Sequence, residues 1–477
     1  MKENYGKNED FFRGRRQSPW LMVAYGMVGA SISGVTFVGV PGMVLTQQMT
    51  YLQTCLGFIL GYAVVALVLL PLYYGSGSAS IYSLLEQRMG EGARHTGAAV
   101  FFVSKMSSAA VRFYVACFIV HGLLLQPLHL PFAATAVAMT LAIWLYTGRS
   151  GIHTLVRTDV VQTTCMLLAL VLIIAKVMGL LHLSLTEAVS AVWQSDMSRI
   201  FVWDDWQSPQ YFWKQFLSGI FIVVVMTGLD QDMMQKNLTC RSLREARMDM
   251  CCYGMAFVPV NLLFLSLGVL LVMLANAWGL QLPAQGDSLL PMFAATGLLG
   301  RAVVVLFVMG VVSASLSSAD SALTALTTSY CVDLRHRPDD ERLRRRAHLT
   351  LTCVFAAIVV GVDAIGSQGV INTIYTLVSY TYGPLLGLFA YALACPWRSD
   401  TKKLSRRAPL LAVAAPLLSY SLSALAALYG YHFSYELLML NGCIMFLGLL
   451  LTTGPDAPTQ ADTSCHLPSR QRPHRKR

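Results

Sequence analysis

Five ionisable side chains stand inside long apolar runs of this sequence: Arg112, Asp159, Asp230, Asp232 and Asp320. A charge in hydrocarbon costs several kcal/mol, about 2.5–3.5 on insertion scales, so such residues are rare and face a cavity, an ion or a partner charge. Carboxylates suit small hard cations, and a guanidinium suits a carboxylate or another anion. These residue types therefore predict a membrane protein that moves or senses a polar solute.

Arg112 and Asp159 lie at different depths in their apolar runs, and this depth decides how each can be interpreted. Arg112 lies about 15 residues into its apolar run, roughly 22 Å at 1.5 Å per residue, so its head group does not easily reach the inner face. We expect it to hold an anion, either a carboxylate of the protein such as Asp230 or one of the solute. Asp159 lies near the inner end of its run, where the helix dipole alone also favours an acid. Both interpretations of Asp159 remain open at this point.

A row of hydroxyls surrounds Asp320 in its apolar run. At helical spacing, one face carries Ser313, Ser317, Ser321 and Thr324, with Ser318 beside it. Bonds from a hydroxyl back to the carbonyl four residues earlier explain one or two of these side chains. They do not explain a carboxylate among them, and an oxygen-rich face with one carboxylate suits sodium.

Composition indicates that these residues are held by a bundle of membrane helices. The 477 residues are 55% hydrophobic and only 13% charged, and mean hydropathy is +0.55; soluble domains carry about 25% charged residues. We therefore expect an all-α polytopic membrane protein. Apolar runs long enough to span a bilayer predict about twelve helices, near 20–45, 53–74, 97–125, 130–147, 157–181, 215–238, 252–277, 299–333, 347–365, 369–395, 408–430 and 433–453.

The distribution of Lys and Arg predicts the orientation. With the N-terminus inside, the inside segments hold 30 of the 35 cations and the outside segments hold three. Both termini are then cytoplasmic, in a cell membrane such as a bacterial inner membrane. The net charge of +10 reflects this topology and contact with anionic lipid rather than a nucleic-acid partner. The eleven cysteines show no metal-ligand spacing, so we expect free thiols.

Two of the predicted helices have sequences that do not favour an unbroken transmembrane helix. Residues 24–36 of the first contain three glycines and three Ser/Thr hydroxyls, which fits either close packing or an unwound stretch that offers carbonyls to an ion. Residues 226–232 of the sixth read Met-Thr-Gly-Leu-Asp-Gln-Asp. Two interrupted helices five spans apart are typical of an inverted-repeat transporter. One repeat would cover about 20–181 and the other about 215–396.

Several segments, in chain order, resemble motifs of the sodium:solute symporter family, which includes sodium-coupled proline, glucose and sialic acid carriers. The similar segments are Asp10-Phe11-Phe12-Arg13-Gly14-Arg15, Ser33 to Gly42, Arg157-Thr158-Asp159-Val160-Val161-Gln162 (Arg standing where the family has Trp), Asp230-Gln231-Asp232-Met233-Met234-Gln235-Lys236 with Arg244-Glu245-Ala246-Arg247, and Ser317 to Asp333. The resemblance implies a leucine-transporter-type fold with a five-plus-five inverted repeat. The predicted organisation is a cytoplasmic segment 1–19, a core 20–396, two additional helices in 397–453 and a disordered basic tail 454–477.

The resemblance also implies binding sites. A sodium ion would bind the carbonyls of Gly29, Ile32 and Ala314 and the hydroxyls of Ser317 and Ser318. As in sialic acid carriers, a second sodium site would use Asp159, Ser317, Asp320 and Ser321. The implied substrate residues are Ser31, Ser33, Thr36 and Arg112, to which we add Asp230 and Gln231 as partners of substrate hydroxyls.

The expected function is secondary active symport, in which sodium drives import of a small polar organic solute such as an acidic sugar, sialic acid or another carboxylate. A monomer suffices for this mechanism. A proton-coupled carrier of the same fold and a transporter-like sensor are the alternatives. We do not expect an enzyme, because side chains at Asp230 and Asp232 would point about 200° apart on an unbroken helix and could not act as an acid–base pair.

Overall fold

The computed structural model describes residues 11–12, 16–76, 78–295, 297, 300–365, 370–395 and 401–452, and every named element in these ranges is a helix. The elements are α2 (Trp20–Ser31), α3 (Gly34–Gly42), α4 (Val44–Gln47), α5 (Tyr51–Val64), η2 (Val65–Leu69), α6 (Leu70–Ser76), α7 (Ser83–Met89), α8 (Glu91–Val120), η3 (His121–Leu125), η4 (Gln126–Leu128), α9 (Phe132–Leu180), α10 (Leu185–Gln194), η5 (Asp196–Ser198), α11 (Phe212–Val223), η6 (Val224–Gly228), α12 (Gln231–Asn237), α13 (Leu243–Ala277), η7 (Gly286–Ser288), α14 (Leu289–Ala295), α15 (Arg301–Ser329), η8 (Tyr330–Leu334), α16 (Glu341–Ile365), α17 (Val370–Ala394), α18 (Thr401–Leu428) and α19 (Leu437–Thr452). The predicted tail 454–477 lies outside the described residues.

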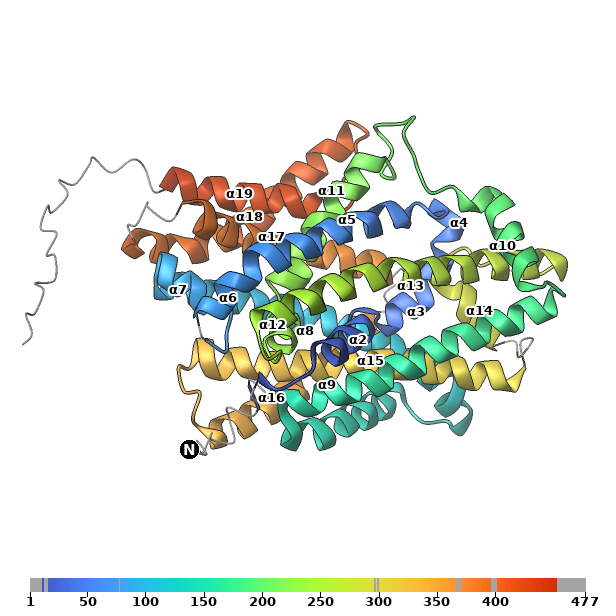
Figure 1. The fold of residues 1–477 in the computed structure, drawn as a ribbon, viewed down its shortest axis with the longest axis horizontal. Helices are drawn as coiled ribbons and strands as arrows, with labels where there is room; N and C mark the ends of the chain where they lie inside the picture. Colours follow the sequence, from blue (N-terminus) through green and yellow to red (C-terminus); the bar gives the residue numbers. More distant parts are fainter. Residues whose placement is uncertain are drawn as a thin grey trace, which may run out of the picture.

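The long helices run roughly along one direction, with α7 near one end of the bundle and α10 and α14 near the other (Figure 1). Eight helices are long and apolar enough to cross a membrane within the described ranges, and two bent pairs add one span each. Two shorter apolar helices, Phe132–Leu145 and Leu437–Thr452, account for the remaining predicted positions. The chain is therefore a multi-pass membrane protein.

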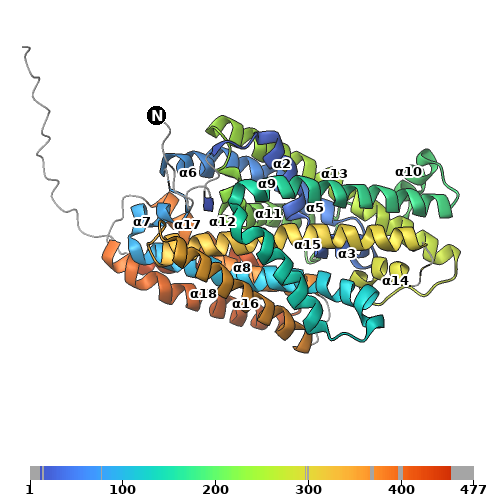
Figure 2. The ribbon, with the colours of Figure 1, turned by 90° about the horizontal axis from the view of Figure 1, so that it is seen from below.

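The predicted fourth and fifth spans are one continuous helix, α9, and not two helices separated by a loop. Residues 147–156 contain two glycines but no proline, so nothing in this stretch removes a backbone donor and the helical bonds continue. At 1.5 Å per residue its 49 residues measure roughly 74 Å, more than twice a hydrocarbon core of about 30 Å. Figure 2 shows that α9 is sharply bent, so its two arms run in different directions.

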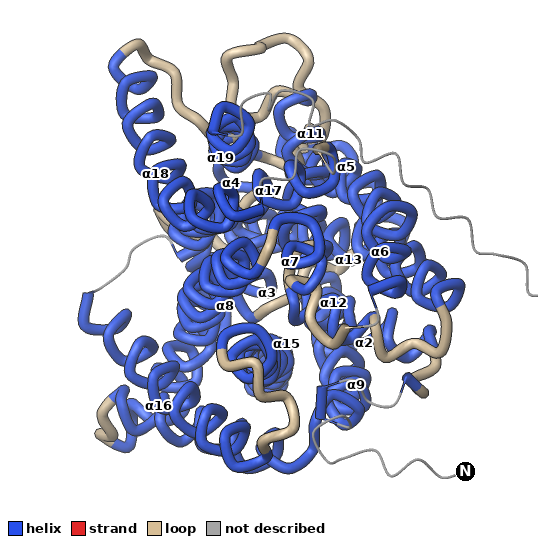
Figure 3. Tube along the Cα trace, turned by 90° about the vertical axis from the view of Figure 1, so that its left-hand side faces the viewer, coloured by secondary structure: helices blue, strands red, loops and turns tan. Residues whose placement is uncertain are grey.

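Both predicted helix breaks are present. The axes of the α2 segment and the following α3–α4 segment differ by 62°, and those of α11–η6 and α12 differ by 70°. In a view along the bundle, α3 and α12 lie near its centre, beside α8 and α15 (Figure 3), and Ile32, Ser33 and Asp230 at the two breaks are buried. The breaks therefore lie inside the protein, where other helices can satisfy the exposed backbone groups.

Glycines allow close contact between α5 and α11, which lie in the first and second predicted repeats. A Cβ added at Gly57 would lie 2.1 Å from the carbonyl oxygen of Phe216, and one added at Gly219 would lie 2.2 Å from that of Thr54. Real side-chain carbons do not approach backbone oxygens so closely. Only glycine on both helices allows this contact, as in other close-packed membrane helices.

Replacing Gly219 with Ala should therefore lower the thermal stability of the purified protein. Overpacking of this kind costs about 1–3 kcal/mol. Gly361→Ala is the matched control, because a Cβ at Gly361 in α16 meets nothing within 4 Å. Equal melting temperatures for the two variants would contradict the packing role of Gly219.

Candidate substrate and ion site

A cavity opens between the two helix breaks. Its polar lining comes from both breaks and from α5, α8, α13, α15 and α17: Ser31, Ser33, Thr36, Tyr51, Tyr62, Lys105, Ser108, Arg112, Thr227, Asp230, Asp232, Tyr253, Ser318 and Tyr382. The cavity also touches Val40 of α3, and α3 contacts α14, which lies near the end of the bundle that carries α10 (Figure 1). A solute reaching the breaks from that end would meet both charged and hydroxyl groups.

At the first break, both interpretations of residues 24–36 apply, since the glycines pack closely and the helix also unwinds. The glycines of α2 pack closely: a Cβ at Gly29 would lie 1.9 Å from the Thr163 hydroxyl of α9. The helix ends just beyond this contact, where Ser33 N–H donates to the Ser31 carbonyl at 3.2 Å and not to Gly29, its partner in a continuous helix. The unwound stretch at Ile32 and Ser33 thus frees backbone carbonyls next to the cavity.

Ser318 of α15 lies directly opposite this break. Its hydroxyl is 3.1 Å from the carbonyl oxygen of Ala30 and 3.1 Å from that of Ala314. The hydroxyl, a carbonyl of α2 and a carbonyl of α15 therefore converge at one point. This cluster of hard oxygen atoms has the chemistry that sodium prefers.

The second break is held by tyrosines from neighbouring helices. Tyr73 donates its hydroxyl to the Gly228 carbonyl at 2.9 Å, and Tyr82 donates to the Leu229 carbonyl at 3.1 Å. On the other side of the break, Asp230 accepts a hydrogen bond from the backbone N–H of Asp232 at 2.9 Å and caps α12. Backbone groups that the break exposes in the membrane interior are in this way satisfied by protein.

Lys105 is the counter-ion of the second break. Its ammonium lies 3.0 Å from Asp230 and 2.7 Å from Asp232, and Asp230 also accepts a bond from the Tyr382 hydroxyl at 3.0 Å. From the sequence, Lys105 and Lys236 were counted among the 30 inside cations, and Arg112 was considered as one possible partner of Asp230. The structure instead buries Lys105 in α8 and pairs it with Asp230. Lys105 lies seven residues before Arg112, on the same face of α8, and this spacing could have revealed its role.

Arg112 lines the cavity without a protein partner. Within the described part of the chain, its guanidinium makes no hydrogen bond and no ion pair. The two acids that line the same cavity, Asp230 and Asp232, both contact Lys105. Arg112 thus presents up to five N–H donors to a solute that enters the cavity.

Asp159 is paired, but with a lysine. Lys236 of α12 places its ammonium 2.8 Å from Asp159 Oδ2, and Ser317 donates its hydroxyl to Asp159 Oδ1 at 2.5 Å. Both charged side chains are buried. Lys236 was also counted as a loop cation from the sequence, which the structure corrects. Ser317 belongs with this cluster rather than with Ser318 at the first break.

Of the other predicted residues, Asp320 is fully buried and accepts a bond from Ser321 at 3.1 Å. Gln231 does not face the cavity, because its amide donates to the Ala79 carbonyl at 2.8 Å and accepts from the Ile81 N–H at 2.9 Å. Its predicted contact with substrate hydroxyls is therefore not supported. Gln231 instead ties α12 to the segment before α7.

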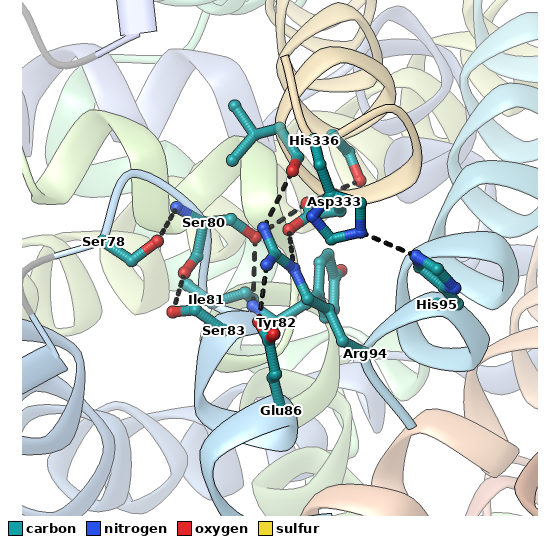
Figure 4. A network of polar contacts seen from close by, with 12 residues as sticks. Ser78, Ser80, Ile81, Tyr82, Ser83, Glu86, Arg94, His95, Asp333 and His336 are labelled. Carbon is teal, nitrogen blue, oxygen red and sulfur yellow. Dashed lines mark hydrogen bonds and ion pairs between the residues drawn. The ribbon is translucent and has the colours of Figure 1, made fainter. Parts of the chain in front are cut away.

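A second polar network joins α7, the start of α8 and η8 (Figure 4). In Figure 1, α7 lies at the end of the bundle opposite α10 and α14. Arg94 bridges Glu86 at 2.6 Å and Asp333 at 3.0 Å, and Ser80 donates to Asp333 at 2.7 Å. Gln235 of α12 adds a bond to the carbonyl of Phe12 at 2.9 Å. Hydrogen bonds and ion pairs therefore hold the helices together at this end of the bundle.

The fold is that of the leucine-transporter type, as solved structures show. A Na+-coupled sialic acid symporter in a substrate-bound, outward-open state has a TM-score of 0.78 at 18% identity, with 94% of this chain and 93% of that chain covered. MhsT in complex with L-phenylalanine has a TM-score of 0.54 at 14% identity, with coverage of 91% and 97%. At these identities the likeness concerns the fold alone.

Residues 11–398 match the model of the sodium:solute symporter family, and the chain belongs to that family. The human sodium/iodide cotransporter (Homo sapiens) is 26% identical over 404 residues, covering 81% of this chain and 61% of the relative. The human sodium-coupled monocarboxylate transporter 1 (Homo sapiens) is 24% identical over 413 residues, with coverage of 82% and 65%. The chain thus spans a little under two-thirds of the length of these relatives.

Removing the buried counter-ion should destabilise the protein. Lys105→Met leaves Asp230 and Asp232 uncompensated, and breaking a buried ion pair in this way costs about 3–5 kcal/mol. The triple variant Lys105→Met, Asp230→Asn, Asp232→Asn removes all three charges and should recover most of the lost melting temperature. If the triple variant melts no higher than the single one, the ion pairs do not stabilise the break.

Proposed function

We propose that this protein is a sodium-coupled symporter that imports a small organic anion, with Arg112 binding the anionic group. The observation that carries this proposal is the guanidinium of Arg112, which lines the cavity and makes no hydrogen bond or ion pair within the described residues, while the two acids of the same cavity both contact Lys105. A buried or half-buried cation without a partner is costly, and an anionic solute removes that cost.

The names of the relatives agree with an anion. The curated relatives are named for iodide and for monocarboxylates, and the structurally similar symporter is named for sialic acid, which is also an acid. Hydroxyls of Ser31, Ser33 and Thr36 line the same cavity and suit the oxygen atoms of a carboxylate or an acidic sugar. We therefore propose a carboxylate as the substrate class, with an acidic sugar as the more specific candidate.

For sodium, we propose the point where Ser318 faces the first break. The hydroxyl of Ser318 and the carbonyl of Ala314 come from α15, and the carbonyls of Gly29, Ala30 and Ile32 are candidates from α2 and its unwound end. An ion there would tie α2 to α15. Because Ser31 and Ser33 flank the same break, ordering it for sodium also orders part of the substrate cavity, and the coupling is reciprocal.

We do not propose that sodium occupies the predicted second site in this conformation. The ammonium of Lys236 already contacts Asp159, at 2.8 Å, where a cation would bind. Sodium could reach Asp159, Ser317, Asp320 and Ser321 only after Lys236 moves away. We therefore propose one sodium site in this conformation and an ion pair at Asp159.

Import would require the contacts at the α7 end of the bundle to open. In the proposed orientation this end is cytoplasmic, the membrane is a bacterial inner membrane, and α10 and α14 lie outside. The bonds of Gln235 to Phe12 and of Arg94 to Asp333 would have to break. Each sodium ion moving inward gains about 2.3 kcal/mol per 100 mV of membrane potential, which helps to drive this step.

The alternatives are separable by experiment. Replacing sodium with choline at fixed pH should abolish uptake by a sodium-coupled carrier and leave a proton-coupled carrier active. Binding without accumulation in proteoliposomes would indicate a sensor. An acid–base role for Asp230 and Asp232 is disfavoured, because both carboxylates contact the same ammonium of Lys105.

Replacing Arg112 tests the proposal directly. Arg112→Gln removes the charge and should reduce uptake of an anionic solute at least tenfold, mainly through a higher KM. Lys176→Gln is the matched control, because Lys176 is an exposed lysine of α9. An unchanged KM in Arg112→Gln, with normal expression, would reject Arg112 as the anion-binding residue.

The sodium site has its own test. Ser318→Ala removes a hydroxyl at the first break and should raise the sodium concentration for half-maximal uptake severalfold. Ser313→Ala removes another hydroxyl of α15, five residues before Ser318, and should leave the sodium concentration for half-maximal uptake unchanged. If both variants keep the wild-type sodium dependence, sodium does not bind at Ser318.

A further inference from the structure

Two histidines and a glutamate meet at the α7 end of the bundle, away from the cavity. Glu91 and His95 lie one turn apart at the start of α8, and His336 lies in the link between η8 and α16. Figure 4 shows His95 and His336 facing one another beside the Arg94 network. No step of the proposed transport mechanism uses these three side chains.

The spacing of their ligand atoms fits a metal ion. The two Nε2 atoms of His95 and His336 are 2.8 Å apart, and Glu91 Oε1 lies 3.9 Å and 3.6 Å from them. The point equidistant from three atoms at these separations lies about 2.0 Å from each. Zinc binds imidazole nitrogen at about 2.0–2.1 Å and carboxylate oxygen at about 2.0–2.2 Å.

The surroundings hold the two imidazoles in this position. Arg94, the neighbour of His95, donates to Asp333 at 3.0 Å and to the Val332 carbonyl at 2.8 Å, which fixes the start of α8 against η8. The residues on both sides of His336 donate backbone bonds to η8, at 3.0 Å from Arg335 and 2.9 Å from Arg337. His336 itself has φ of 51°, an uncommon conformation for a residue other than glycine.

The charge balance at the site also permits a cation. The charge of Arg94 is offset by Glu86 and Asp333, and the side chains of Arg335 and Arg337 are exposed to solvent. Glu91 supplies one negative charge, and two neutral imidazoles supply nitrogen ligands. Such a mixed donor set favours zinc and similar transition metals over sodium, magnesium or calcium.

We propose that Glu91, His95 and His336 form a binding site for a transition-metal dication such as Zn²⁺, with a fourth position left for water. The ion would clip the start of α8 to the link between α15 and α16. Since α8 carries Lys105 and Arg112 and α15 carries Ser318, the clip would fix the two helices of the transport site relative to each other. The proposal does not depend on the substrate or on sodium.

The test uses the full chain, purified in detergent without a polyhistidine tag and stripped of metal. Titration with Zn²⁺ should show one ion bound per protein and a higher melting temperature. His95→Gln and His336→Asn should each weaken binding at least tenfold and abolish the thermal shift. Asn is chosen at position 336 because it tolerates positive φ.

Other histidines provide the controls. His182→Gln changes an exposed histidine in the link after α9, and His466→Ala with His474→Ala changes the C-terminal segment, so neither should alter Zn²⁺ affinity. X-ray absorption of the bound zinc should show nitrogen and oxygen ligands including two imidazoles. Wild-type affinity in His95→Gln and His336→Asn, sulfur ligands, or no zinc binding to the wild-type protein would overturn the proposal. In the last case the two imidazoles are simply hydrogen-bonded to each other.

Discussion

Polar groups that interrupted helices expose in the membrane interior need partners, and the rest of this structure is arranged around that requirement. At the second break, Tyr73 and Tyr82 donate hydrogen bonds to two backbone carbonyls, and Lys105 forms ion pairs with both Asp230 and Asp232. Each partner comes from a different element, so α5–α6, the α7 region and α8 must all converge on α12. Lipid tails cannot hydrogen-bond exposed backbone groups, so without protein partners the break would cost several kcal/mol per exposed group.

We propose that the polar groups of the cavity that are not paired in this way bind the ligands. Arg112 retains an unpaired charge toward the cavity, and the first break retains carbonyls opposite Ser318. The protein thus separates structural charges from functional ones within a single helix, since Lys105 and Arg112 lie two turns apart on α8. In this proposal a bound anion pairs with Arg112, and a bound sodium ion coordinates the carbonyls opposite Ser318.

Much of this architecture could be predicted from the sequence, because apolar run length reports spans and because Gly, Ser and Asp within such runs report breaks. The partners could not be predicted, since Lys105 and Asp230, or Lys236 and Asp159, are far apart in the chain and meet only after folding. Lys105 and Lys236 stand at the ends of apolar runs, where loop cations and buried ones look alike. The loop predicted at residues 148–156 was wrong for another reason: glycine is permitted in a helix, so the two glycines there do not end α9.

Sodium-driven accumulation of an organic anion is the central claim, and one measurement tests it most directly. Purified protein in proteoliposomes is given an inward sodium gradient and a pair of labelled solutes, a small carboxylate and its uncharged amide. The account predicts that the carboxylate is concentrated inside, that the amide is not, and that replacing sodium with choline abolishes the effect. Equal uptake of both solutes, or carboxylate uptake that persists in choline at the same pH, would contradict it.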